Sequence, residues 1–303
     1  MLTIKHFIPL IPYVVVIAIG FLAWLIATNA FRPVWPFTLW RTKKKKSPVK
    51  QKLLAYPGKT LANTLEDRMM DFLPLSLLLI MGPSVAWLFY VLFVQPSTTS
   101  ISILTFVVPM LVGTAAGCIS LRRTARKMRY LRLGLDAERA TGEELNQLMR
   151  EGFYVFHDFP AESFNIDHIL IGPSGVYSVE TKSRAKLTGK GTDGASVQRN
   201  GDTLQFPTYL DRESIPQARR QAMWLARFIR DCVGKEIRVK AVLALPGWYV
   251  APGSHDGEVL VINPFNPQGF FRNRPVRLDD QTIKQVAFQI EQKCRTITPF
   301  DPY

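Results

Sequence analysis

The stretch "NIDHILIGPSGVYSVETKSR", Asn165 to Arg184, contains two apolar runs separated by the turn sequence "GPSG". Glycine and proline between two short apolar runs predict a β-hairpin. Polar residues stand at the outer ends of both runs, Asp-His before the turn and Glu-Thr-Lys after it. A solvated rim and a functional site would both place polar residues there, so the register of the hairpin has to decide between them.

The simplest register has a two-residue loop at Pro173-Ser174, and it makes Asp167 face Glu180. Side chains alternate along a strand, so Lys182 lies on the same face as Glu180. Two ionised carboxylates about 5 Å apart repel by roughly 3 kcal/mol at an effective dielectric near 20. A proton, a cation or water must offset that repulsion. Two alternatives stay open: a three-residue loop would break the pairing, and a Glu-x-Lys pair can be an ordinary solvated ion pair.

A divalent cation would give this arrangement a chemical use, while His168 points to the other face of the hairpin. Mg²⁺ prefers hard oxygen ligands and binds one or two carboxylates together with waters and substrate phosphate. Such an ion polarises a phosphodiester and lowers the pKa of bound water, and a nearby ammonium can orient that water. Asp167, Glu180 and Lys182 supply these groups, so we expect an Mg²⁺ (or Mn²⁺) site.

A helix is predicted before the hairpin, in "LGLDAERATGEELNQLMREG". Its inward stripe recurs at helical spacing and consists of Leu135, Glu138, Gly142, Leu145 and Met149. Glu138 would then approach the same ion from this helix. In the alternative, the helix begins near Thr141 as its cap and Glu138 lies in solvent.

The rest of the C-terminal part reads as alternating elements. The predicted order is helix, three strands, helix, two strands, helix. The first strand is expected at 153–159, and a hairpin or loop insertion at 188–207 follows the hairpin strands. The remaining elements are a helix at 215–234, strands within 236–248 and 258–264, and a helix at 279–295. On the helix at 215–234, Gln217 and Gln221 share a face. This order predicts a mixed α/β domain.

The N-terminal part does not resemble a globular domain. Three uncharged apolar runs, 7–28, 72–94 and 101–121, each exceed the ~18 residues of a candidate membrane-spanning helix. Basic segments follow the first run at 41–52 and the third at 122–129. By the positive-inside rule both segments face the cytoplasm. We therefore expect a multi-pass anchor in the inner or plasma membrane at residues 1–129 and a cytoplasmic domain at 130–303.

The net charge of +14 is concentrated in the N-terminal part. From Tyr130 onward there are 22 basic and 21 acidic residues, whereas the first 129 residues hold 16 and 3. Topology and attraction to anionic lipid headgroups explain this excess without nucleic acid. The three cysteines form no CxxC pair and predict reduced thiols, and the four histidines lack zinc-ligand spacing.

The segments "GLDAER", "FYVFHDF", the hairpin stretch and "IPQARRQA" together resemble the nuclease-related domain (NERD) family, regarded as a branch of the PD-(D/E)xK nuclease superfamily. The resemblance covers about Gly134 to Leu245. It implies a restriction-endonuclease-like mixed sheet flanked by helices. Ile166 stands where the superfamily pattern often has proline.

The resemblance also implies roles for individual residues. Asp167 and Glu180 would bind the metal ion, and Glu138 would complete its ligands. Lys182 would assist the attack on phosphorus, and Gln217 would orient a phosphate or the lysine.

The expected function is a membrane-anchored, divalent-metal-dependent nuclease acting on DNA, less readily on RNA. One rival is a non-catalytic nucleic-acid-binding or membrane-scaffold module that keeps the fold, which the nearly neutral C-terminal domain favours because phosphate affinity needs cationic contacts. Another is a membrane-complex subunit packed through Gly113 and Gly117, a small-xxx-small pair. The sequence leaves the oligomeric state open.

Overall fold

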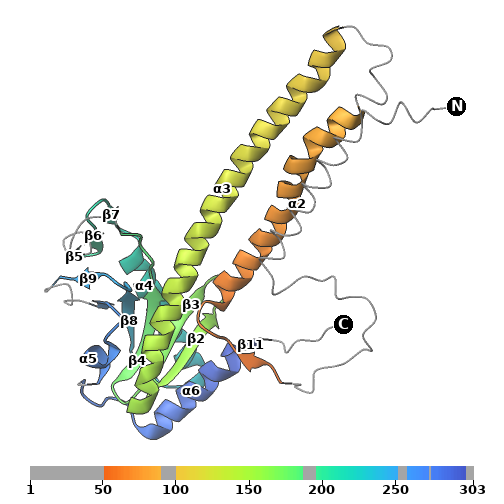
Figure 1. Ribbon diagram of the computed structural model, residues 1–303. Helices are drawn as coiled ribbons and strands as arrows, with labels where there is room; N and C mark the ends of the chain where they lie inside the picture. Colours follow the sequence, from red (N-terminus) through yellow and green to blue (C-terminus); the bar gives the residue numbers. More distant parts are fainter. Residues whose placement is uncertain (1–50, 90–99, 187–195, 252–257, 273, 298–303) are drawn as a thin grey trace. The chain divides into compact units, whose positions relative to one another are not determined.

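The computed structural model describes residues 51–89, 100–186, 196–251, 258–272 and 274–297 (Figure 1). The described residues divide into two units, one with 64–89 and 100–130 and the other with 51–63 and the described part of 131–297. All the residues predicted to form the site belong to the second unit.

The described residues of the first unit lie in two helices, α2 (Lys59–Phe89) and α3 (Ser100–Asn146). Among the residues that the structure describes, no helix combines the length and the apolar character needed to cross a membrane. The spans predicted at 72–94 and 101–121, which fall mainly on these helices, are therefore not supported. The apolar run at 7–28 lies outside the described residues.

The second unit contains a five-stranded mixed sheet with the strand order β10-β8-β4-β3-β2. An antiparallel meander is formed by β2 (Tyr154–Pro160), β3 (Asn165–Gly172) and β4 (Gly175–Thr181). Parallel to β4 run β8 (Val239–Ala244) and then β10 (Val259–Ile262). The crossover that parallel pairing requires includes α4 (Ser214–Val233). The predicted order of elements and the mixed α/β class are confirmed.

Helices cover both faces of this sheet. The core on one face includes residues of α4 and of α6 (Asp280–Cys294), among them Leu225 and Ile290. The core on the other face includes Leu145 at the end of α3, Leu148 in the 3-10 turn η6 (Gln147–Glu151), and Phe271 of α5 (Pro267–Phe271). The strands are buried on both faces, so they appear in the sequence as nearly continuous apolar runs.

The hairpin has the predicted two-residue loop. Its pairs run from Gly172–Gly175 to His168–Val179. Both glycines are required: a Cβ on Gly172 would lie 2.4 Å from Cδ1 of Phe153, and Gly175 has a φ of 134°. The register is therefore confirmed, although the regular ladder ends one pair before the predicted pairing of Asp167 with Glu180.

Smaller elements complete the unit. The predicted insertion forms a hairpin of β5 (Ser196–Asn200) and β6 (Thr203–Gln205), extended by β7 (Leu210–Asp211) and β9 (Tyr249–Val250) into a second sheet. A two-stranded sheet pairs β1 (Leu53–Leu54) with β11 (Arg295–Ile297), at opposite ends of the described chain. No pattern in the sequence predicted the pairing of β1 with β11.

The helix before the hairpin differs from both predicted versions. It does not begin near Thr141, because α3 is continuous from Ser100 through Asn146. The inward stripe is also shorter than predicted: Leu135 and Leu145 are buried, but Met149 is 50% exposed. The helical spacing ends before Met149, because residues 147–151 form the 3-10 turn η6.

Candidate active site

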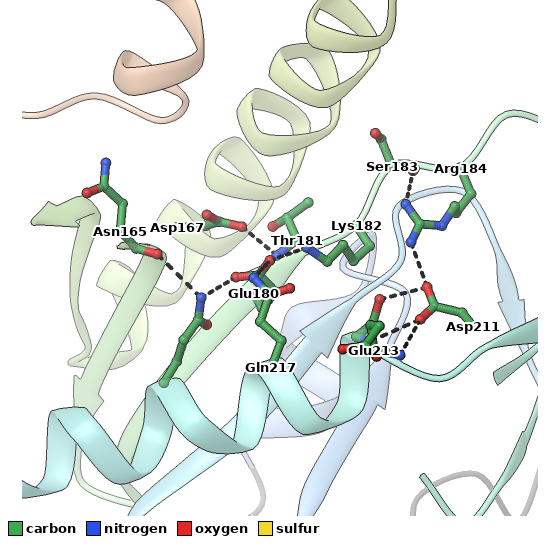
Figure 2. A network of polar contacts seen from close by, with 12 residues as sticks. Asn165, Asp167, Glu180, Thr181, Lys182, Ser183, Arg184, Asp211, Glu213 and Gln217 are labelled. Carbon is green, nitrogen blue, oxygen red and sulfur yellow. Dashed lines mark hydrogen bonds and ion pairs between the residues drawn. The ribbon is translucent and has the colours of Figure 1, made fainter. Parts of the chain in front are cut away.

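Glu180 is the centre of a polar network at the end of β4, where it is only 4% exposed. Its Oε1 accepts hydrogen bonds from Lys182 Nζ at 2.6 Å and Gln217 Nε2 at 2.7 Å. Its Oε2 accepts one from Gln221 Nε2 at 2.6 Å. Figure 2 shows Gln217 pointing from α4 toward Glu180. Gln217 and Gln221 are one helical turn apart, so α4 presents both amides to the same carboxylate.

Asp167 lies next to Glu180 on the neighbouring strand. Its Oδ2 accepts a hydrogen bond from the Thr181 backbone N–H at 2.7 Å, so the side chain bonds to β4 where the ladder has stopped (Figure 2). Desolvation, followed by the charges of Glu180 and Glu138, raises the pKa of Asp167 well above its usual value, against the Thr181 hydrogen bond and Lys182. The Asp167 and Glu180 carboxylates are therefore close enough to repel each other when both are ionised.

Glu138 faces inward from α3. The sequence alone did not decide between this orientation and a solvent-exposed one. It is half-buried, and a Cβ on Gly58 would lie 3.4 Å from its Oε2. Desolvation, and then the charges of Asp158 and Glu180, raise the pKa of Glu138 to about 8, while Lys182 lowers it. The structure thus brings Glu138 into the same electrostatic environment as Asp167 and Glu180.

Asp158 is a further buried carboxylate, which sequence reasoning missed. It lies on β2, in the register position beside Asp167, and its φ of 50° is left-handed. Asp158 Oδ2 accepts two hydrogen bonds from Thr60, one from its backbone N–H at 2.9 Å and one from its Oγ1 at 2.8 Å. Asp158 Oδ1 accepts a hydrogen bond from Asn165 Nδ2 at 2.9 Å. Asp158 thereby caps the first turn of α2 from a strand that is distant in sequence. No local sequence pattern predicts such a contact.

The donor chemistry of the site fits a hard divalent cation. Glu138, Asp167 and Glu180 bring three carboxylates near one ammonium, that of Lys182, and carboxylate oxygens are the ligands Mg²⁺ prefers. The carboxylates are not gathered into a finished coordination sphere. Across the described ranges, no group of three His, Cys, Asp or Glu side chains is arranged to hold a metal ion. Both oxygens of Glu180 are instead bonded to the lysine and the two glutamines.

A second ion pair fixes the start of α4. Asp211 accepts from Arg184 NH2 at 2.6 Å, from Ser214 Oγ at 2.7 Å, and from the backbone N–H groups of Glu213 and Ser214 at 3.0 Å (Figure 2). Burial opposes the ionised form, but the hydrogen bonds from Ser214, Arg184 and Glu213 lower the pKa of Asp211 to about 2. Asp211 therefore acts as an N-terminal cap that positions the helix carrying Gln217. An acidic residue just before a predicted helix is the sequence signal that could have identified Asp211 as this cap.

The described histidines, His157 and His168, contact each other and do not bond to this network. His168 contacts His157 on β2, with 2.9 Å between their Nδ1 atoms, and His157 Nε2 lies 3.1 Å from Asn146 Oδ1. Burial lowers the pKa of His157 to about 4 and that of His168 well below its usual value. Both rings are therefore neutral near pH 7, in keeping with a packed structural pair.

Three comparisons with known proteins were made. A search of curated proteins and a search of solved structures each gave no significant match. Residues 133–246 match the family model of the nuclease-related domain (NERD). The matched range includes Glu138, Asp167, Glu180, Lys182 and Gln217. The central part of this chain is therefore similar to a nuclease-related domain.

Proposed function

We propose that this nuclease-related domain hydrolyses phosphodiester bonds of nucleic acid, DNA more readily than RNA, in a reaction that depends on Mg²⁺ or Mn²⁺. The observation that carries the proposal is the position of Lys182. Its ammonium lies 2.6 Å from the buried Glu180 carboxylate, on the strand beside Asp167. The family match and the fold, which we take to be restriction-endonuclease-like, support the same reading.

The side chains divide the work by their chemistry. Asp167, Glu180 and Glu138 would hold the cation, because they supply the carboxylate oxygens. Such an ion, when bound, polarises the phosphate and lowers the pKa of a water ligand. Lys182 is 23% exposed and can donate a hydrogen bond to a phosphate oxygen or an attacking water. Gln217 holds Glu180 from α4 and can orient either the lysine or a phosphate.

The test is cleavage by the full-length protein of single- and double-stranded DNA and of RNA, with Mg²⁺, with Mn²⁺ and with EDTA. We expect metal-dependent cleavage of DNA and a loss of at least about 100-fold in Lys182→Ala, within the usual range for a catalytic proton donor or acceptor. Lys186→Ala is the matched control, since Lys186 is an exposed lysine on the same segment. No cleavage with either metal, or equal cleavage by Lys182→Ala, would refute the proposal.

A second candidate function is a non-catalytic nucleic-acid-binding module. The observation that favours it is the saturation of Glu180, whose two oxygens already accept three hydrogen bonds as in a structural network. DNA binding by Asp167→Ala and Glu180→Ala distinguishes the two functions. A binding module should keep its affinity for DNA in both variants, with or without Mg²⁺. A nuclease should lose the part of its DNA affinity that depends on Mg²⁺.

We also propose that residues 1–129 attach the protein to the inner or plasma membrane, with residues 130–303 in the cytoplasm. The support is the sequence: three apolar runs flanked by basic segments, which also favour anionic lipid headgroups. Fractionation tests the proposal. The protein should stay with membranes in alkaline carbonate, and release into the supernatant would contradict it.

A further inference from the structure

A cavity lies at the other end of the sheet from the candidate active site. Its volume is about 440 Å³, and it is bordered by the turn between β3 and β4, the first residues of β8, and the segment after α5. Glu180 pairs with Leu243 near the end of β8, whereas the cavity is lined by Arg238 and Lys240 near its start. The cavity is therefore separate from the network around Glu180.

Four cationic side chains line this cavity: Arg238, Lys240, Arg274 and Arg277. One carboxylate, that of Glu236, also lines it, but Glu236 is 84% exposed and lies 3.7 Å from Arg230. In the part of the chain that the structure describes, none of the four cations forms an ion pair. Since residues 130–303 are almost neutral overall, this is a local excess of positive charge.

Backbone contacts fix the two segments that carry these cations. Lys240 lies in the interior of the sheet, where it pairs with Tyr177 of β4. The N–H groups of Arg277 and Leu278 both donate to the Pro173 carbonyl, at 2.8 and 3.2 Å, which ties the segment after α5 to the hairpin turn. Arg274 Nε donates to the Phe270 carbonyl at 2.6 Å. The cations therefore surround the cavity from two fixed segments that are far apart in sequence.

Their mutual repulsion is not relieved within the protein. Lys240 is half-buried, and desolvation lowers its pKa, with further lowering by Arg274, Arg238 and Arg277. A bound anion would relieve both the repulsion and the loss of hydration. Arginine and lysine together are the usual ligands of phosphate, the first by paired N–H donors and the second as a point charge.

We infer that this cavity binds a small molecule carrying one or more phosphate groups. Its volume falls in the range of about 300–1,000 Å³ that is typical of small-molecule sites, larger than a single phosphate needs. Apolar residues also line the cavity, and the half-buried Leu278 would contact the rest of the ligand. This inference is independent of the proposed nuclease activity, because no residue of the cavity belongs to the network around Glu180.

The experiment is titration of the full-length protein with inorganic pyrophosphate, with a nucleoside diphosphate and with a 5′-phosphorylated oligonucleotide, in EDTA to suppress cleavage. Binding is read by calorimetry and by hydrogen exchange of peptides covering 236–244 and 274–280. We expect saturable binding of the pyrophosphate and the diphosphate with protection of both peptides. Binding of the oligonucleotide with the same protection, and of neither small ligand, would show that the phosphate belongs to a nucleic-acid end and would overturn the small-molecule assignment.

Variants give the second arm. Removing one charge-assisted hydrogen bond should weaken binding by about tenfold or more, so Lys240→Gln and Arg277→Gln should each raise Kd by that factor. Arg227→Gln removes an exposed charge on α4 and should leave Kd unchanged. Lys240→Arg keeps the charge and should retain binding if the fold tolerates the longer side chain, and its hydrogen exchange reports the fold. Absence of binding by the wild type, or equal weakening in Arg227→Gln, would overturn the inference.

Discussion

Asp211 offers a sharp test of how α4 is held against the candidate site. The change is Asp211→Asn, which removes the charge while keeping the shape of the side chain. Asp211 is 8% exposed and accepts hydrogen bonds from Arg184, Ser214 and Glu213. Because α4 carries the glutamines that bond to Glu180, a loosened first turn should disturb the network as well as the stability.

The magnitude follows from the pKa of Asp211, which falls from 3.8 to about 2 on folding. At about 1.36 kcal/mol per pKa unit, the ionised carboxylate contributes about 2 kcal/mol of folding free energy at neutral pH. Loss of a helix cap alone costs about 1 kcal/mol, so the two estimates are compatible. Since the folded pKa is depressed, this stability is fully present above the unfolded pKa of 3.8 and is lost as pH falls through about 2.

The assay is urea unfolding of the full-length protein, followed by hydrogen exchange in peptides covering α4 and β4, at pH 7 and at pH 2.5. Asp211→Asn should lower the free energy of unfolding by about 2 kcal/mol at pH 7 and by clearly less at pH 2.5. Asp202→Asn is the matched control: Asp202 also pairs with an arginine, at 2.6 Å, but its side chain is 49% exposed, so about 0.5 kcal/mol or less is expected. Equal effects for both variants, or an effect independent of pH, would refute the reasoning.

Two further predictions concern the neighbourhood of Glu138. Gly58→Ala should destabilise the protein by about 1 kcal/mol more than Gly152→Ala. Both glycines have a positive φ, but only at Gly58 would the new Cβ meet a neighbour, at 2.5 Å from Leu135 Cδ1. Equal losses of stability for the two variants in thermal unfolding would contradict this prediction. In EDTA, Glu138→Gln should raise the free energy of unfolding by as much as about 5 kcal/mol at pH 9 and leave it unchanged at pH 4, because the pKa of Glu138 shifts from 4.5 to about 8 on folding. The raised pKa of Glu138, about 8, means that wild-type stability falls as pH rises from 4.5 through 8. The control Asp136→Asn, exposed on the same helix, should show no such pH dependence.

The hairpin and its register could be predicted from the sequence because both depend on local chemistry. The glycines of "GPSG" and the alternation of the two strands allow few turns, and a two-residue loop fixes every pair that follows. The shared face of Gln217 and Gln221 followed in the same way from helical geometry. These local rules were enough to name Asp167, Glu180 and Lys182 as neighbours before the fold was known, whereas Gln217 was assigned to the site only by the family resemblance.

Other parts depended on contacts between distant segments. The spacing around Glu138 was compatible with two helices and favoured the one that begins near Thr141. Packing decided for the other: the residues before Thr141 continue α3, and Glu138 is half-buried. The role of Asp158 could not be predicted from the sequence, because it depends on the pairing of β2 with β3 and on the contact of Asp158 with the first turn of α2.

The sequence by itself thus determined the hairpin, the order of the main elements and the shared position of Asp167, Glu180 and Lys182 at its end, since turn chemistry and side-chain periodicity act over a few residues. The tertiary structure alone decided the burial of Glu138, the cap made by Asp158 and the cationic cavity. In that cavity, Lys240 and Arg277 come from segments more than thirty residues apart. The physical reason is the range of the interactions: burial and electrostatic coupling depend on which distant segments meet, and no local pattern records that.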